Sequence, residues 1–125
     1  MRRIWVCSAV FLAVAFLCTM FVRAYGEKAK FTIEQVMDKV HKKPNLAKKL
    51  TDGSISEEEK KTLIEYYEEL PKNKPPKGSA EDWKKRTETL LATAKAATTG
   101  GAAERASYRK AVNCKSCHDA HKAED

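Results

Sequence analysis

The positions of proline and glycine constrain the fold of this chain more than any other feature. Pro44, the proline-rich stretch 71–79 and the pair of Gly100 and Gly101 interrupt the sequence at three places. Between these breaks, apolar residues recur every three or four positions, which is the spacing of an amphipathic helix. We find no run that alternates apolar and polar residues as a half-buried strand does. The sequence therefore predicts an all-α protein.

Capping signals mark where the expected helices begin. Thr32 with Gln35 and Ser56 with Glu59 match the capping box, and Ser79 is a third N-cap residue. A short helical piece is expected just after Pro44. The main helices are expected over 32–43, 56–70, 79–97 and 102–121. Because connections this short favour antiparallel neighbours, we expect an up-and-down four-helix bundle.

The first 24 residues differ in composition from the rest. Arg2 and Arg3 are followed by an apolar run over 4–22 and by a small residue, Ala24. This is the pattern of an export signal, and we expect cleavage after Ala24 to leave a single domain at 25–125. The alternative is an uncleaved membrane anchor, because the apolar run is just long enough to span a bilayer. In either case the rest of the chain lies outside the cytoplasm, and we expect a periplasmic protein.

Removal of this leader would leave Cys114 and Cys117 as the only cysteines. The leader also contains three of the arginines. After cleavage the net charge, +7 for the whole chain, would therefore be smaller and only weakly positive. Such a balance is not typical of a nucleic-acid-binding protein. The sequence has no paired carboxylates, nucleophile–base set or phosphate-binding loop that would indicate an enzyme.

The stretch CKSCH, at residues 114–118, carries the strongest chemical signal. C-x-x-C-H is the attachment motif of c-type haem. Each thiol forms a thioether with one vinyl group of the porphyrin, and positions i and i+3 of a helical turn reach vinyls on neighbouring pyrroles. The next residue then lies under the ring, where a histidine ligates the iron. We therefore expect one haem c, tethered by Cys114 and Cys117 and ligated by His118.

Two other uses of these residues stay open. A CxxC in an exported protein can form a disulfide, but redox-active motifs of the thioredoxin type belong to an α/β fold, and no strands are expected here. Cys114, Cys117, His118 and His121 would also supply four zinc ligands. So crowded a set on one helix does not easily surround a metal ion. The pattern therefore favours haem over both alternatives.

The last expected helix is predicted to turn its motif toward the interior. Its inner face would hold Ser107, Ala111, Cys114, Cys117 and His118. Small residues in the last two helices would leave room beside this face for a flat, wide group; they are Ala94, Ala97, Ala106 and Ala111. We therefore expect the haem to lie against the C-terminal helix, inside the bundle.

A CKSCH close to the C-terminus of a four-helix pattern resembles the class II c-type cytochromes, the cytochrome c′ group. Class I cytochromes carry the motif near the N-terminus and a ligand methionine far downstream, whereas this chain has no methionine after Met37. The resemblance covers about residues 30–121 and implies a periplasmic protein with His118 as the fifth iron ligand. Family members either transfer electrons or bind gases such as NO and CO. The chain departs from the family in being short and in the break at Pro44.

The resemblance also bears on the sixth ligand. Low-spin members use a methionine on the first helix, and Met37 lies on the inward face of the helix expected there. We expect Met37 to be the distal ligand, with His41, one helical turn later, as the alternative. The third alternative is an open position, as in the high-spin members, with Met37 serving only to fill the core.

Further residues are candidates for the surroundings of the haem. Trp83 is expected to line the pocket, and Lys110, one turn before Cys114, to pair with a propionate. The ordinary alternatives are an aromatic core residue and a solvated lysine. His121 is expected to be exposed. The cations around the attachment site would attract an acidic redox partner; they are Arg109, Lys115 and Lys122.

The sequence therefore predicts an exported monohaem c-type cytochrome, not an enzyme, that carries single electrons between periplasmic partners. Two axial ligands would suit this role, because little rearranges when an electron moves. The alternatives are a gas-binding protein with an open or displaceable distal ligand, and a haem subunit of a larger redox complex. We expect a homo- or heterodimer through the first two helices, no nucleic acid, and membrane attachment only if the leader is retained.

Overall fold

The computed structural model describes residues 28–124, so the expected leader over residues 1–24 lies outside the described residues. Between residues 28 and 124 the chain is helical and contains no strand, which confirms the all-α class. No helix in this part of the chain combines the length and the apolar character needed to cross a bilayer. In chain order the elements are α2 (Ile33–Val36), the π-helical turn η1 (Met37–His41), α3 (Leu46–Asp52), α4 (Glu57–Glu69), the 3₁₀ turn η2 (Leu70–Lys72), α5 (Ala80–Thr99), α6 (Ala102–Ala111) and α7 (Cys114–His121).

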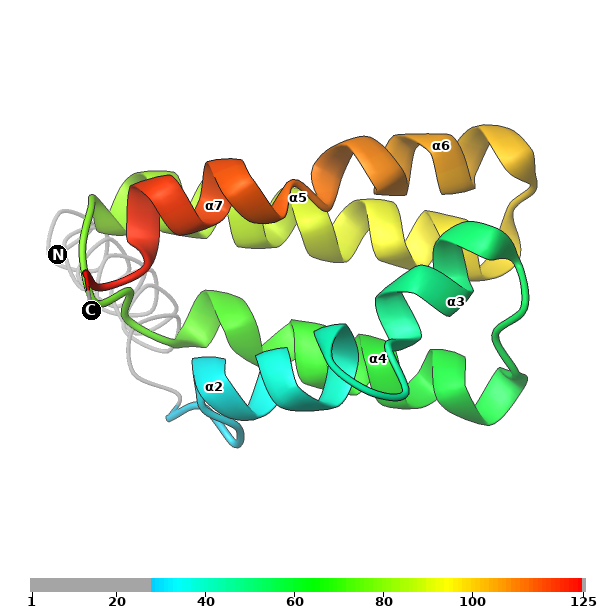
Figure 1. The fold of residues 1–125 in the computed structure, drawn as a ribbon, viewed down its shortest axis with the longest axis horizontal. Helices are drawn as coiled ribbons and strands as arrows, with labels where there is room; N and C mark the ends of the chain where they lie inside the picture. The colour runs from blue at the N-terminus through cyan, green and yellow to red at the C-terminus, as the bar shows by residue number, and fades with distance from the viewer. Residues whose placement is uncertain (1–27, 125) are drawn as a thin grey trace, which may run out of the picture.

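The helices form two layers along the long axis of the molecule (Figure 1). In one layer α5 packs along α6, and α7 continues beyond α6 toward the loop that precedes α5. In the other layer α2 lies beside α4. α3 contacts α4, α5 and α6, and thereby joins the layers at one end. The expected helices are thus present, but the last of them is divided in two and the first changes its winding.

The expected capping signals all form. Thr32 Oγ1 accepts a hydrogen bond from the Gln35 amide at 3.2 Å, and the Gln35 side chain accepts one from the Thr32 amide at 2.9 Å. Ser56 and Glu59 make the same reciprocal pair at 3.2 and 3.0 Å. Ser79 Oγ accepts from the amide three residues later at 3.1 Å. The predicted starts of α2, α4 and α5 are confirmed.

The N-terminal helix changes from α to π winding after one turn. In η1 the Lys42 amide donates to the Met37 carbonyl at 3.1 Å, a bond to the fifth preceding residue that makes the turn wider than an α-helical one. Pro44 then prevents the helix from continuing. The Asn45 side chain accepts from the Lys48 amide at 2.9 Å and begins α3. The expected break at Pro44 and the short helix after it are confirmed.

The C-terminal helix is not continuous, so the prediction of one helix over 102–121 is wrong. Val112 leaves the helical region with ψ of 71°, and the Asn113 side chain accepts from the Ser116 amide at 3.0 Å. Asparagine side chains compete with the backbone in this way and favour helix starts. Asn113 therefore begins α7 as a separately capped helix. On α6 the buried residue is Tyr108, whereas Ser107, expected to face inward, is exposed.

The core lies between the two layers and is built from aliphatic and aromatic side chains. Tyr67 and Tyr108 are its largest fully buried side chains. Trp83 is 4% exposed, and its Nε1–H donates to the Leu70 carbonyl at 3.1 Å. The remaining core residues are Val36, Val40, Leu46, Ala47, Leu50, Ile55, Leu63, Leu70, Ala94 and Ala97. Throughout residues 28–124, every buried side-chain nitrogen and oxygen has a hydrogen-bond partner.

The proline-rich loop between η2 and α5 packs against the end of α7. Gly78 has φ of +80°, a conformation that favours glycine. A Cβ at this position would lie 2.5 Å from the Ala120 carbonyl oxygen and 2.8 Å from Nδ1 of His121. The neighbouring Lys77 carbonyl is 3.1 Å from the same Nδ1 atom. This loop therefore fixes the C-terminal end of α7.

Gly78→Ala should destabilise the protein more than Gly53→Ala. Both glycines have positive φ, at +80° and +76°, so each alanine costs about 1 to 2 kcal/mol. At Gly53 the nearest atoms to a new Cβ belong to the Arg105 side chain, at 3.5 Å. At Gly78 the Cβ also displaces the backbone of α7, and we expect a further loss of about 1 to 3 kcal/mol. Urea unfolding followed by circular dichroism measures both variants, and equal losses would contradict this packing.

Candidate functional site

The CKSCH motif forms the first turn of α7, directly after the Asn113 cap. Its three functional side chains differ in exposure. Cys117 is half-buried and packs against the core, whereas Cys114 and His118 are exposed. The prediction that all three face the interior is therefore wrong for Cys114 and His118. The break at Asn113 explains the difference, because α7 does not keep the register of α6.

Both cysteines are free thiols. Burial raises the pKa of the Cys117 thiol, and the nearby Arg86 partly opposes this effect. The four residues considered as zinc ligands are not gathered, since no three His, Cys, Asp or Glu side chains within residues 28–124 are placed to hold a metal ion. The disulfide and zinc alternatives thus find no support in this arrangement of the side chains.

Arg86 on α5 ties the motif to the rest of the molecule. Its Nη1 donates to Ser116 Oγ, inside the CKSCH stretch, at 2.8 Å. Its Nε donates to Asp82 Oδ2 at 2.6 Å, one helical turn earlier on α5. The guanidinium therefore links the beginning of α7 to the beginning of α5, and Arg86 lies close enough to Cys117 to affect its thiol.

His121 closes the other end of α7, and the expectation that it is exposed is wrong. The residue is 2% exposed. Nε2 lies 2.8 Å from Asp82 Oδ2, and Nδ1 lies 3.1 Å from the Lys77 carbonyl oxygen. Each ring nitrogen of His121 therefore faces an oxygen that accepts hydrogen bonds. Hydrogen bonds from Arg86 and then from His121 hold the pKa of Asp82 below its usual value.

A second polar group faces the motif from the opposite layer. His41 Nε2, at the end of η1, lies 3.2 Å from the Tyr67 hydroxyl of α4. The Tyr67 hydroxyl lies 2.6 Å from the Tyr108 hydroxyl of α6, and both tyrosines are fully buried. These three residues form a continuous hydrogen-bonded chain between the layers.

Charges of CKSCH residues contribute to the pKa values of this hydrogen-bonded chain. Burial lowers the pKa of His41 to about 4, and the charge of His118 contributes to the shift. Burial raises the pKa of both Tyr67 and Tyr108, and Cys114 adds to the effect on each. The His41–Tyr67–Tyr108 chain is therefore electrostatically coupled to residues of the first turn of α7.

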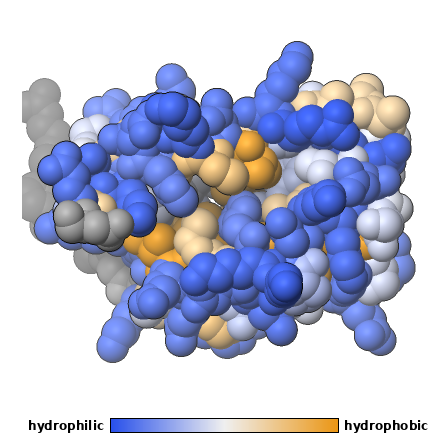
Figure 2. Space-filling model, in the orientation of Figure 1, coloured by the Kyte–Doolittle hydropathy of each residue, from blue (hydrophilic) through white to orange (hydrophobic). Residues whose placement is uncertain are grey.

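Apolar side chains border the same region. Figure 2 shows a hollow between the α2 side and the α6–α7 side of the molecule, with hydrophobic surface on both of its walls. The partly buried apolar side chains that these elements contribute are Ile33, Met37, Val112 and Cys117. The expected inward position of Met37 is thus consistent with its packing against the core. A group bound here would contact thiol, imidazole and aliphatic side chains.

The two lower-ranked candidates lie elsewhere. Trp83 is a core residue whose ring meets His121 edge-on, with the ring centroids 5.3 Å apart. It supports the far end of α7. Lys110 is exposed on α6. The assignment of both residues to a haem pocket stays a prediction.

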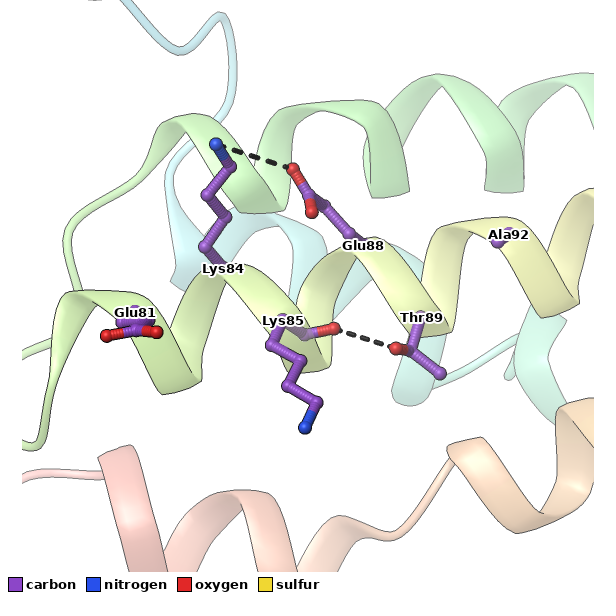
Figure 3. Close-up of a pocket in the computed structure, with 6 residues that line it drawn as sticks. All are labelled: Glu81, Lys84, Lys85, Glu88, Thr89 and Ala92. Atoms are coloured by element: carbon purple, nitrogen blue, oxygen red, sulfur yellow. Dashed lines mark hydrogen bonds and ion pairs between the residues drawn. The ribbon is translucent and has the colours of Figure 1, made fainter.

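The pocket drawn in Figure 3 is separate from this region. It is a shallow depression along the outer side of α5, and its charges are paired within the helix, as in the 3.8 Å contact between Lys84 and Glu88. Thr89 Oγ1 donates to the Lys85 carbonyl at 2.8 Å. The lining residues are Glu81, Lys84, Lys85, Glu88, Thr89 and Ala92. None of them belongs to the motif.

Sequence reasoning did not identify Asp82, Arg86 and Tyr108. The first two carried a signal, because opposite charges four residues apart in a helix commonly pair. Tyr108 is the one large aromatic side chain of the stretch 102–121, which favours burial.

Compared with family models, curated proteins and solved structures, the chain shows no match.

Asp82→Asn should destabilise the protein, whereas Glu81→Gln should have little effect. Both carboxylates lie in the first turn of α5, so both variants lose the same favourable interaction with the helix dipole. Only Asp82 also bonds Arg86 and His121. We expect a lower urea midpoint at pH 7 for Asp82→Asn alone. Equal midpoints for the two variants would show that these bonds do not hold α7.

Acid should destabilise the protein through His41. The pKa of His41 is about 4 in the folded protein, against an ordinary value near 6.5 when unfolded. Between these values the unfolded chain binds the proton and the folded chain does not. Stability conferred by the neutral ring is therefore complete above pH 6.5 and is lost as the pH falls to 4, by about 3 kcal/mol in all.

The measurement compares urea unfolding at several pH values in a Cys114→Ser, Cys117→Ser background, which cannot attach haem. His41→Gln in the same background serves as the control, because glutamine does not titrate. We expect the His41 chain to lose more stability on acidification than the control. An equal loss of stability on acidification in the two proteins would rule out a neutral, buried His41.

Proposed function

We propose that residues 25–125 form an exported monohaem c-type cytochrome that carries one electron at a time between periplasmic partners. The observation that carries the proposal is the position of CKSCH. The motif forms the first turn of a capped helix, with free thiols at Cys114 and Cys117, beside an apolar hollow and opposite a half-buried histidine. This combination would provide two tethers and an iron ligand beside apolar side chains.

The residues present fit a haem. Cys114, Cys117 and His118 occupy positions i, i+3 and i+4 of one helix, which is the arrangement that two thioethers and a proximal imidazole require. Met37 and His41, both half-buried on η1, would offer a thioether or an imidazole as a second iron ligand. When bound, the haem would supply an iron that stores and releases a single electron.

The chain's own residues would control that iron through position and surroundings. Arg86 and Ser116 hold the first turn of α7 in place. The apolar side chains of the hollow would exclude water and thereby affect the reduction potential. Exposed cations near the motif, Arg109 and Lys115, would draw an acidic redox partner to this face.

We propose further that the two layers are a class II four-helix bundle whose first and last helices are modified. The π turn and Pro44 shorten the first helix, and Asn113 divides the last. Ile64 of α4 is partly buried, and its remaining hydrophobic surface is one that a second subunit would cover. A homo- or heterodimer through the first two helices accounts for that surface.

Attachment of haem should depend on both cysteines of the motif. The full chain is expressed for export together with a cytochrome c maturation system, and covalent haem is measured by intact mass and by staining of denatured protein. We expect one haem in the wild-type chain and in Cys18→Ser. The double variant Cys114→Ser, Cys117→Ser should carry none. Covalent haem in that double variant, or its absence from the wild-type chain, would refute the proposed function.

A further inference from the structure

Two side chains on η1 are candidates for the second axial position, and they differ in what holds them. Met37 and His41 are four residues apart in a single π turn, so they lie on the same side of the helix and only one of them would reach a given metal centre. Both are half-buried. Their surroundings therefore decide between them.

Met37 is held by packing alone. It lies against the core cluster as one of several partly buried hydrophobic residues. Methionine is flexible and fills irregular gaps well, so this position needs no further role to explain the residue. Replacement by leucine would preserve most of that packing, since the two side chains have similar volumes.

His41 is held by directed bonds. Its Nε2 lies 3.2 Å from the Tyr67 hydroxyl, which lies 2.6 Å from the Tyr108 hydroxyl. In one arrangement of the protons, Nε2–H donates to Tyr67, and Tyr67 donates to Tyr108. Nδ1 of His41 then has a free lone pair. Metal-ligating histidines almost always donate their other N–H to a partner that fixes the ring, and Tyr67 is placed to be that partner.

The location of His41 agrees with this role. The ring is near enough to His118 to feel its charge, although the two residues come from opposite layers of the fold. Among the helices of residues 28–124, π winding occurs only over Met37–His41; the other departure from α winding is the 3₁₀ turn η2. Single π turns within helices are frequently found at functional sites, because they change the direction of the side chains they contain.

We infer that His41, oriented by the Tyr67–Tyr108 pair, is the second axial ligand of the haem held by Cys114, Cys117 and His118. This inference rests on the proposed function and replaces the expected Met37. It gives the iron two imidazole ligands and closes both axial positions. The chain would then act as an electron carrier, and a gas would bind only after His41 is displaced.

The test uses the mature haem-loaded protein, with haem content measured first. Near-infrared magnetic circular dichroism of the ferric wild-type chain distinguishes two imidazoles from imidazole and thioether. CO is then added to the reduced forms of wild type, His41→Ala and Met37→Leu. We expect a spectrum of two imidazoles, with no CO binding by wild type or Met37→Leu. His41→Ala should become high-spin and bind CO.

The assignment to His41 is overturned if the wild-type spectrum shows a thioether ligand. It is also overturned if Met37→Leu binds CO while His41→Ala keeps the wild-type spectrum and binds none. Either result leaves the proposed function standing. Absence of covalent haem from the wild-type chain overturns the proposed function itself. If His41→Ala does not fold, the wild-type spectrum still decides which side chain is the ligand.

Tyr67→Phe tests the positioning role, with Tyr66→Phe as the matched control. Tyr66 is the adjacent tyrosine, and its ring stacks on Phe31 with the centroids 4.1 Å apart. Loss of the bond from His41 to Tyr67 makes the imidazole a weaker electron donor. We therefore expect the reduction potential to rise in Tyr67→Phe and to stay unchanged in Tyr66→Phe. An equal potential in both variants would show that Tyr67 does not act through His41.

Discussion

The carboxylate of Asp82 holds the functional helix of this protein in place. It accepts hydrogen bonds from Arg86 and from the buried His121, at 2.6 and 2.8 Å. Arg86 in turn bonds Ser116, so both ends of α7 are fixed to the start of α5. α7 is only eight residues long and would not be stable alone. The position of CKSCH, and thus of any group attached to it, depends on this polar network together with the packing of Cys117 against the core.

Much of the fold could be predicted from local patterns, because each pattern reflects a local physical cause. The capping boxes at Thr32 and Ser56 form as expected, and so does the break at Pro44. The division of the last helix could not be predicted from apolar spacing, which continues through it. Asn113 was the available signal, but an asparagine within a helical pattern has several outcomes, and tertiary contacts decide between them.

For the site, the sequence indicates a chemistry as a proposal, but it did not predict the arrangement of the side chains. The CKSCH motif indicated Cys114, Cys117 and His118 as candidate residues. Their exposure could not be predicted, because it depends on the break before α7. His121 looked like a terminal, exposed residue because its partners, Asp82 and the Lys77 carbonyl, are far away in the chain. The same limit applies to His41. Its bond to Tyr67 joins two helices and changes an edge histidine into an oriented ligand candidate.

We propose that the chain carries one covalently bound haem at CKSCH. The most direct measurement is the absorption spectrum and intact mass of the wild-type protein after export and acid–acetone extraction, which removes haem that is not covalently bound. We expect a mass larger than that of the processed polypeptide by one haem, with a low-spin spectrum in both oxidation states. A protein that loses all haem absorption on extraction, and has the mass of the bare polypeptide, would contradict it.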